Sequence, residues 1–347
     1  MTHNITTRDT VISVRDAGWH GLAKVLADYV TPEQARKQAF DWEPIPTPLY
    51  RAEPVVAEDG TLSTTYVEID GTVGVQRSDT GEFFGAVSSE FGETLAHTGN
   101  KALTEIAEAV EGIAAGDVRV ETAGSLKGGR KVWMLLRLND PIEVAGDPNG
   151  ATIPYFALQT SHDGSGSFRG QALHTRIICD NTSQAADLEA QGRGTEFTFR
   201  HTSGIKDRIE EAKAAVAGWR ESIEKWNILM AQLMDVTITP AQRDIFIGEF
   251  LPMPVSTKTV SPRVLTNIEN ARGEFYGIIN GLTCEGIDHT AYGLVQASIE
   301  FQQHVRGVRG DSDLARAESR FKRAYLDRDN LTTVAVNLAR EVSLIDA

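Results

Sequence analysis

Cysteine is scarce in this chain of 347 residues, which has only Cys179 and Cys284. The two stand far apart inside apolar segments, so a disulfide framework or a zinc knuckle is excluded and two buried free thiols are expected. The sequence also lacks any apolar run near the roughly 18 residues that a membrane helix needs. The N-terminus is polar and interrupted by charges, unlike a secretory signal. These absences predict a cytoplasmic protein.

Motifs for catalysis, metal binding and phosphate binding are also missing. The eight histidines show no H-x-x-x-H or H-E-x-x-H spacing, and no G-x-x-x-x-G-K-[ST] loop occurs. His162 and His174 could face each other across a hairpin, but strand histidines are more often polar edge residues than ligands. Ser161-His162-Asp163 spells a triad, yet consecutive strand residues alternate faces. We expect a turn held by Asp163 and Ser161 instead, and no metal, cofactor or enzymatic activity.

Positive charge is in short supply, since 34 Lys and Arg stand against 48 Asp and Glu, a net charge of −14. A globally basic nucleic-acid binder is therefore excluded. The imbalance is uneven, with 8 basic against 19 acidic residues over 1–117, 11 against 10 over 118–208, and 15 against 19 over 209–347. A cationic groove in the middle third and an acidic protein-binding surface in the first third both remain open.

The first 48 residues are expected to form an irregular lead-in before a core domain over residues 49–202. The lead-in should contain a short helix over residues 32–40, with proline at its first turn. It ends in Ile45-Pro46-Thr47-Pro48, which predicts a rigid extended linker. The β-rich runs of the core meet at turn-forming residues, namely Asp59-Gly60, Thr80-Gly81, Lys127-Gly128-Gly129-Arg130 and Asp163-Gly164.

Periodicity predicts the elements of the core. Residues 118–126 and 131–138 should pair as a hairpin, and the second strand is apolar on both faces, which is typical of a central strand. Residues 153–183 should supply two further strands. Apolar stripes or capping residues predict helices over residues 93–115 and 181–190. The core is thus predicted to be an antiparallel sheet with helices.

A helical region is predicted over residues 203–347. Its first helix carries a heptad seam of apolar residues, Ile205, Ile209, Ala212, Val216, Trp219, Ile223, Trp226, Met230 and Leu233. The seam either packs against other helices of the same chain or mediates self-assembly, and the sequence does not separate the two. Further helices are expected over residues 240–248, 262–280, 291–306 and 313–340.

A cationic and aromatic surface is the one candidate binding site in the core. Its members are Lys127, Arg130, Lys131, Trp133, Phe168, Arg169 and Arg176. Cations that track phosphates and aromatic faces that stack on bases are what a single-strand binder needs. The competing interpretation is that hairpin ends are usually charged and that aromatic residues in strands belong to the core.

Two runs of residues resemble the signature of an uncharacterised phage- and plasmid-borne domain family, S-H-D-G-S followed by R-x-x-C-x-N-T. They are Ser161-His162-Asp163-Gly164-Ser165 and Arg176-Ile177-Ile178-Cys179-Asp180-Asn181-Thr182. Residues 290–304 resemble another block of that family, which usually has Asn where this chain has Gln296, and residues 18–22 also fit. The resemblance implies a gene of an actinobacterial phage or plasmid, and hence a location in the bacterial cytoplasm.

The order of strands and helix is also similar to the β-β-β-α core of single-strand annealing recombinases, the superfamily of phage Red-beta and the eukaryotic annealase. That similarity implies a homo-oligomer, a ring in those proteins, that binds single-stranded DNA and anneals strands without ATP. The sequence-based expectation is therefore an α+β annealase-like core with a mostly helical C-terminal region. The alternative is a protein-interaction module of a mobile element, a host-defence inhibitor or assembly factor, that uses its acidic surface. A nucleotide-processing enzyme is a third option.

Overall fold

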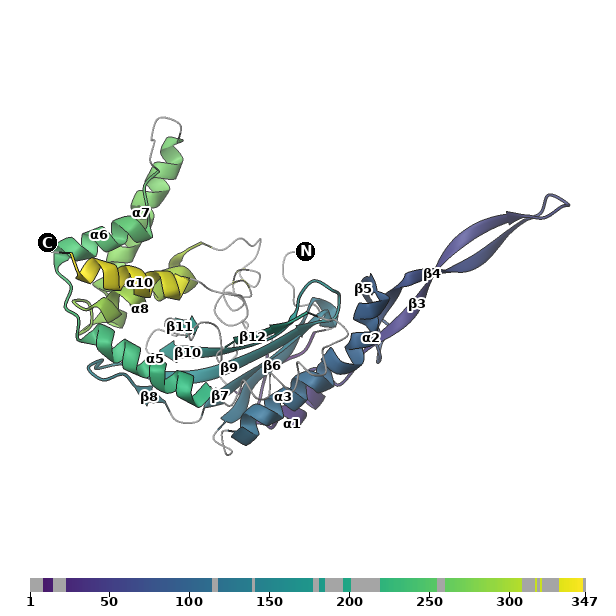
Figure 1. The fold of residues 1–347 in the computed structure, drawn as a ribbon, viewed down its shortest axis with the longest axis horizontal. Coiled ribbons are helices and arrows are strands. Elements are labelled where there is room, and N and C mark those ends of the chain that lie inside the picture. Colours follow the sequence, from purple (N-terminus) through teal and green to yellow (C-terminus); the bar gives the residue numbers. More distant parts are fainter. Residues whose placement is uncertain are drawn as a thin grey trace.

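The chain has an α+β fold with two antiparallel-rich sheets and helices at both ends of the larger one (Figure 1). We describe it from a computed structural model. The residues described are 9–14, 23–113, 118–138, 141–176, 181–184, 196–200, 219–254, 260–307, 316, 319 and 331–345.

The larger sheet runs in the order β11-β10-β9-β7-β6-β1-β2, with β12 on β10 and β8 on β9. Its strands are β1 (Val11–Ser13), β2 (Lys24–Val25), β6 (Val118–Leu126), β7 (Lys131–Leu138), β8 (Ile142–Glu143), β9 (Ala151–Ser161), β10 (Phe168–Arg176), β11 (Asn181–Gln184) and β12 (Glu196–Phe199). All pairs are antiparallel except β1 with β2. The predicted central position of β7 is confirmed, because apolar side chains on both its faces are buried.

The smaller sheet is a meander of β3 (Pro44–Val56), β4 (Leu62–Arg77) and β5 (Phe83–Ser88). The predicted turns are confirmed: Gly60 (φ +82°) and Gly81 (φ +69°) take the left-handed backbone that glycine tolerates. The segment predicted as a linker, residues 45–48, is instead part of β3. Beyond their contact with β5, β3 and β4 continue as a two-stranded ribbon that projects far from the rest of the molecule (Figure 1).

Helix α1 (Pro32–Ala39) precedes the smaller sheet in the chain, and α2 (Ser89–Thr98) and α3 (Asn100–Ile113) follow it. α1 and α3 cover one face of the larger sheet, where Leu103, Ile106 and Val110 pack with the apolar residues of β6, β7 and β9. The predicted single helix over residues 93–115 is therefore two helices. It breaks at Gly99, where a Cβ would lie 2.6 Å from Glu43 Oε2.

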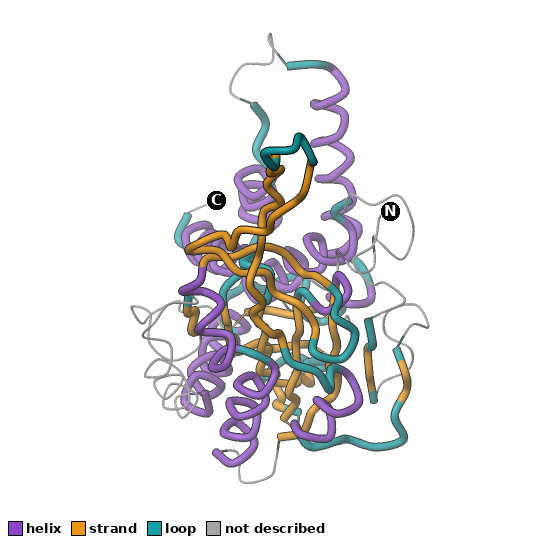
Figure 2. The backbone as a smooth tube through the Cα atoms, turned by 90° about the vertical axis from the view of Figure 1, so that its right-hand side faces the viewer, coloured by secondary structure: helices purple, strands orange, loops and turns teal. Residues whose placement is uncertain are grey.

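From residue 219 onward the described elements are helices. They are α5 (Trp219–Met234), α6 (Pro240–Phe250), α7 (Pro262–Ile279), the 3₁₀ turn η3 (Leu282–Cys284), α8 (Ala291–Glu300), the π-helix η4 (Phe301–Val305) and α10 (Leu331–Ser343). These helices form a second hydrophobic core, which includes the buried side chain of Cys284. α7 rises away from the others in both views (Figures 1 and 2). Cys179 lies outside the described residues.

Helix α5 joins the two cores. Trp219 and Ile223 at its start are buried with the sheet residues, whereas Trp226, Met230 and Leu233 are buried among the other helices. The described half of the predicted heptad seam therefore packs within the chain. The earlier half, residues 205–218, lies outside the described residues.

Where it is described, the predicted lead-in of residues 1–48 packs on the core: β1 pairs with β6, and Phe40 and Trp42 are core residues. One further prediction needs correction. Residues 181–184 form strand β11 rather than the start of a helix, because they continue the antiparallel ladder of β10. Residues 185–190, the remainder of that predicted helix, are not described. Of the helix predicted over residues 313–340, the structure describes residues 316 and 319 and the part in α10, and all of these are helical.

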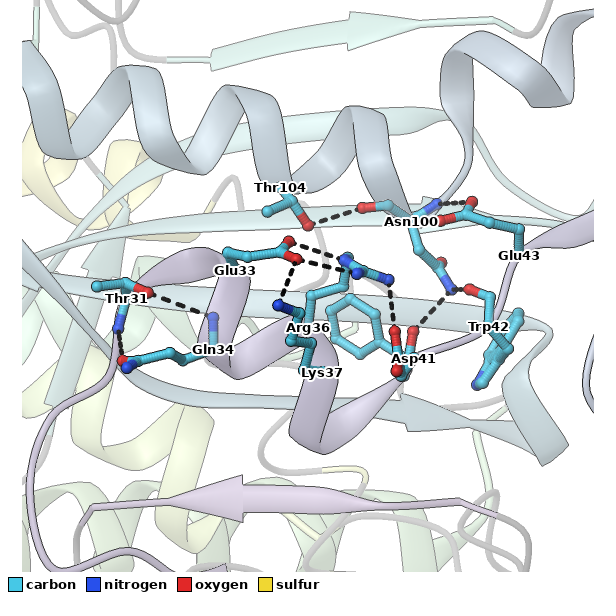
Figure 3. Close-up of polar contacts among 11 residues, drawn as sticks. Thr31, Glu33, Gln34, Arg36, Lys37, Asp41, Trp42, Glu43, Asn100 and Thr104 are labelled. Atoms are coloured by element: carbon cyan, nitrogen blue, oxygen red, sulfur yellow. Dashed lines mark hydrogen bonds and ion pairs between the residues drawn. The ribbon is translucent and has the colours of Figure 1, made fainter.

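The side chain of Asn100, which is fully buried, connects three separate segments (Figure 3). Its Nδ2 donates to the carbonyl oxygens of Phe40 (3.3 Å) and Trp42 (2.6 Å), and its Oδ1 lies 2.9 Å from His162 Nε2. The Asn100 amide also donates to Glu43 Oε2 at 3.0 Å. Burial raises the pKa of the Glu43 carboxyl despite this bond. Asn100 thus fixes the root of β3 to α3 and to the turn after β9.

Replacing this asparagine should destabilise the fold. N100A removes the side-chain donor of the Trp42 carbonyl, one of two donors of the Phe40 carbonyl and the partner of His162 Nε2, so we expect a loss of about 2–4 kcal/mol in the free energy of unfolding. T104V is the matched control, since buried Thr104 gives only one bond, to the Asn100 carbonyl, and should cost about 1 kcal/mol or less. Urea denaturation measures both. Equal costs for the two variants would contradict the role of Asn100.

Candidate functional site

Three of the cations predicted to bind phosphate, Lys127, Arg130 and Lys131, lie in or next to the turn between β6 and β7. This turn contains the 3₁₀ segment η1 (Lys127–Gly129), with Lys127 at φ 58° and Gly129 at φ 103°. The Arg130 guanidinium is committed to backbone groups: it donates to the carbonyl oxygens of Phe84 (2.8 Å), Phe83 (3.3 Å) and Lys127 (3.4 Å). Arg130 therefore ties β5 of the smaller sheet to the larger sheet.

The turn between β9 and β10 lies beside this one and behaves as predicted. Ser161 Oγ donates to Asp163 Oδ1 at 2.7 Å, and the Ser165 amide donates to the same oxygen at 3.0 Å. Burial acts to raise the pKa of Asp163, but these hydrogen bonds and the charge of Lys131 hold it below its ordinary value. His162, between the two, faces Asn100 instead, so no triad forms.

The two predicted stacking residues are in the interior. Trp133 is 1% exposed, and Phe168 is 0% exposed and stacks on Phe197 and Phe199 with ring centroids 6.2 and 6.5 Å apart. Neither ring presents a face to solvent, so the base-stacking role inferred from the sequence is withdrawn. The competing interpretation, that strand aromatics belong to the core, holds at both positions.

The remaining two arginines lie at opposite ends of β10. Arg169 is half-buried and shares a row with Gln159 and Trp133 across three strands, near the turn of residues 127–131. Arg176 is in register with Thr152 at the other end. Seven residues of strand place the two Cα atoms about 23 Å apart. The structure therefore brings together Lys127, Arg130, Lys131 and Arg169, and separates Arg176 from them.

The two histidines considered as metal ligands also lie apart. His162 follows β9 in the turn, whereas His174 is in register with Pro154 further along β10. His174 is fully buried and stacks on Trp226 of α5, with centroids 4.3 Å apart and planes 7° apart. In the described part of the chain, no three His, Cys, Asp or Glu side chains are grouped so as to hold a metal ion. No described helix is long and apolar enough to cross a membrane.

A buried polar cluster on the larger sheet was not identified from the sequence. Glu121 is 5% exposed, and the Tyr155 hydroxyl lies 3.0 Å from each of its oxygens. Arg137 Nη1 is 3.6 Å from Glu121 Oε2 and also donates to the Tyr29 hydroxyl. Each charge in this cluster has a partner, so it fixes β6, β7 and β9 to the segment that carries Tyr29.

The β3–β4 ribbon is a highly exposed surface that was not identified from the sequence. Cross-strand pairing places Tyr50 opposite Glu68, Ala52 opposite Tyr66, Pro54 opposite Thr64 and Val56 opposite Leu62. Residues directly opposite share a face, so one face of the ribbon carries most of its large apolar groups. Leu62 is 72% exposed, Tyr66 71%, Val56 66% and Tyr50 55%.

Charge is also one-sided on the free part of the ribbon, residues 49–71. It holds one basic residue, Arg51, and five acidic ones, Glu53, Glu58, Asp59, Glu68 and Asp70, a net charge of −4. The signals in the sequence were the alternating prolines at 44, 46 and 48 and two β-rich runs without the apolar alternation of a half-buried sheet. Both predict strands that are not covered by a core.

The base of the ribbon is anchored by a buried arginine. Arg77 is 7% exposed and forms paired bonds to Asp79, at 3.0 and 2.8 Å. Its Nη1 donates to the Gly128 carbonyl at 3.2 Å, and its guanidinium lies 4.4 Å from the centre of the Trp42 ring. The projecting ribbon is therefore held at a fixed position on the body.

Stability should fall in acid because of His174. Burial lowers its pKa from 6.5 to about 3, so below pH 6.5 the unfolded chain takes up a proton that the folded chain does not. The variant H174F keeps an aromatic ring against Trp226 but cannot take up this proton. Between pH 6.5 and pH 3, we expect the free energy of unfolding of the parent to fall by up to about 1.4 kcal/mol per pH unit more than that of H174F. Urea denaturation from pH 7 to pH 4 measures this difference.

The control for that measurement is H289F, because the His289 side chain is 60% exposed. Identical pH profiles for H174F and the parent chain would show that the imidazole does not contribute to acid sensitivity.

A family model described as a domain of unknown function, DUF932, matches residues 96–325, which is 230 of the 347 residues. Comparison with curated proteins and with solved structures gave no match. The matched segment begins in α2 and includes the larger sheet from β6 onward, while the β3–β4 ribbon precedes it. Because the match covers about two thirds of the chain, this protein belongs to the DUF932 family.

Proposed function

We propose that this chain is a protein-interaction module and that the β3–β4 ribbon is its binding arm. The observation that carries the proposal is the combination of projection and exposed apolar side chains on one ribbon face. A two-stranded hairpin is marginally stable in water unless something packs on it. In the described structure, β5 and α2 lie at its base and residues 49–71 extend beyond them (Figure 1).

The size of the apolar contribution supports binding. Covering a valine or leucine side chain contributes about 1.5–3 kcal/mol, and Val56 and Leu62 are adjacent at the tip. Tyr50 and Tyr66 add large rings with few rotatable bonds, the kind of side chain that dominates protein interfaces. Four such anchors contribute on the order of 6–12 kcal/mol when fully covered, which is comparable with the cost of association.

The acidic residues of the ribbon select the partner's charge. With a net charge of −4 around the tyrosines, the ribbon favours a basic polypeptide surface and disfavours nucleic acid. We place this activity in the cytoplasm of a bacterial host, as a host-defence inhibitor or assembly factor of a phage or plasmid. Support for that origin is the S-H-D-G-S and R-x-x-C-x-N-T resemblance.

Single-stranded DNA binding is a second candidate, supported by one observation. Lys127, Lys131 and Arg169 lie at the same end of the larger sheet, where they would attract phosphates. The succession of β3, β4, β5 and α2 is similar to the β-β-β-α order of annealases, and the proposal would extend to ATP-independent annealing by a homo-oligomeric ring. The buried Trp133 and Phe168 take no part in it.

Site-specific photo-crosslinking in bacterial cells tests both candidates. A benzophenone amino acid at position 66, on the ribbon, should give protein adducts that the same group at position 282 does not, since Leu282 is 80% exposed on the body. The same group at position 127 should give nuclease-sensitive adducts if DNA is bound there. Absence of adducts at 66 above the level at 282 contradicts the binding arm, and absence at 127 contradicts DNA binding.

A further inference from the structure

We infer that the ribbon pairs with the ribbon of a second copy of this chain, edge to edge along β4, to form a four-stranded antiparallel sheet across a two-fold axis. The inference rests on the proposed function, because the ribbon must be an interaction arm, and it goes beyond it: edge pairing uses backbone groups of β4 and leaves the side-chain face of each ribbon to a basic partner. It follows from which backbone groups of the ribbon are open to pairing.

The contact at the tip of the ribbon shows which residue pairs of β3 and β4 are hydrogen-bonded. The Ala57 amide donates to the Thr61 carbonyl, and antiparallel pairs then alternate between bonded and non-bonded. Val56 with Leu62, Pro54 with Thr64 and Ala52 with Tyr66 are therefore non-bonded pairs. The backbone N–H and C=O groups of these residues point away from the partner strand, toward the outer edges of the ribbon.

Prolines close the outer edge of β3. Pro54 stands at an outward-pointing position, and nearer the base Pro44, Pro46 and Pro48 follow one another at alternate positions. Proline has no N–H, so Pro54 interrupts the row of outward donors of the free part of β3, and the other three prolines remove the donors nearer the base. This is a known way in which proteins prevent pairing at a sheet edge.

The outer edge of β4 has no such protection over its free length. The strand contains no proline, and β5 begins to pair with it only at Thr72, which is in register with Ser88. The outward-pointing groups of Leu62, Thr64, Tyr66 and Glu68 are thus available to another strand. Each chain has one open ribbon edge, so self-pairing closes a dimer and does not extend into a filament.

A symmetric register also fits the side chains. If Tyr66 faces its counterpart, Thr64 faces Glu68 of the other copy and Ser63 faces Ile69, so no two carboxylates are directly opposite. Each ribbon carries a net charge of −4, so the two ribbons repel each other and added salt, which screens this repulsion, should strengthen the dimer. Added salt would instead weaken binding to a basic partner.

The test is the solution mass of three chains measured by sedimentation equilibrium. The parent should have twice the monomer mass of 37.8 kDa. T64P removes one outward donor without breaking the β3–β4 ladder and should shift the chain toward monomer. A52P places the same residue on the outer edge of β3 and should remain dimeric. Circular dichroism confirms that both variants are folded.

A second measurement does not depend on proline. Opposed Tyr66 residues would have Cα atoms about 5.5 Å apart, a distance that a disulfide can span. Y66C should therefore form a covalent dimer on oxidation, and Y50C, on the same face of β3, should not.

Monomeric parent chain, or equal masses for T64P and A52P with equal crosslinking of Y66C and Y50C, would overturn the dimer. If the parent is monomeric but position 66 still crosslinks to a foreign protein, the binding arm stands and only the second copy is rejected. If neither a dimer nor an adduct forms, both proposals fail.

Discussion

The hydrogen bonds of buried Asn100 hold the two sheets of this protein in one arrangement. They connect residues 40 and 42, which lead into β3, with the start of α3 and with His162 after β9. Arg130 and Arg77 complete the junction, since both donate to backbone carbonyls across it. Buried polar groups are costly unless every partner is in place, so the junction has one stable geometry. That geometry sets the direction in which the ribbon projects.

The ribbon and the body depend on different forces. Helix α5 joins two of the three hydrophobic clusters of the body, and its tryptophans enter one of these two each. Past its base, the ribbon has backbone pairing and a proline-rich strand but exposed tyrosine, valine and leucine side chains. Ordering those residues costs conformational entropy that the chain does not recover by burial. An interaction surface gives that arrangement a physical reason.

The sequence was sufficient to predict the elements whose patterns are local. Strand β7 was assigned to the sheet centre because both its faces are apolar, and the turns at Gly60 and Gly81 follow from glycine's tolerance of positive φ. The break at Gly99 was missed because the apolar stripe continues through it, and the group that accepts from the first amide of the second helix, Glu43, is distant in the sequence. The prolines of residues 45–48 predicted a linker. Proline excludes a central strand but not an edge strand, and these residues lie in the edge strand β3.

The candidate site depended on contacts that no local pattern contains. Trp133 and Phe168 alternate with cations along the chain, yet strand alternation directs both rings into the interior. Arg130 has the charge of a phosphate ligand, but its donors are used by carbonyls of β5, nearly fifty residues earlier. The acidic first third was noted as a possible protein-binding surface, and this stays a prediction. Only the structure shows that part of its negative charge lies on a projecting ribbon.

Hydrogen exchange of the individual β4 amides tests most directly whether the open ribbon edge is where this protein binds. The amides of Ser63, Thr65 and Val67 point toward β3 and should exchange slowly at any protein concentration. Those of Thr64, Tyr66 and Glu68 point outward and should become slow only when the ribbon is paired, at high concentration. Fast exchange of these three amides under every condition would contradict pairing at this edge.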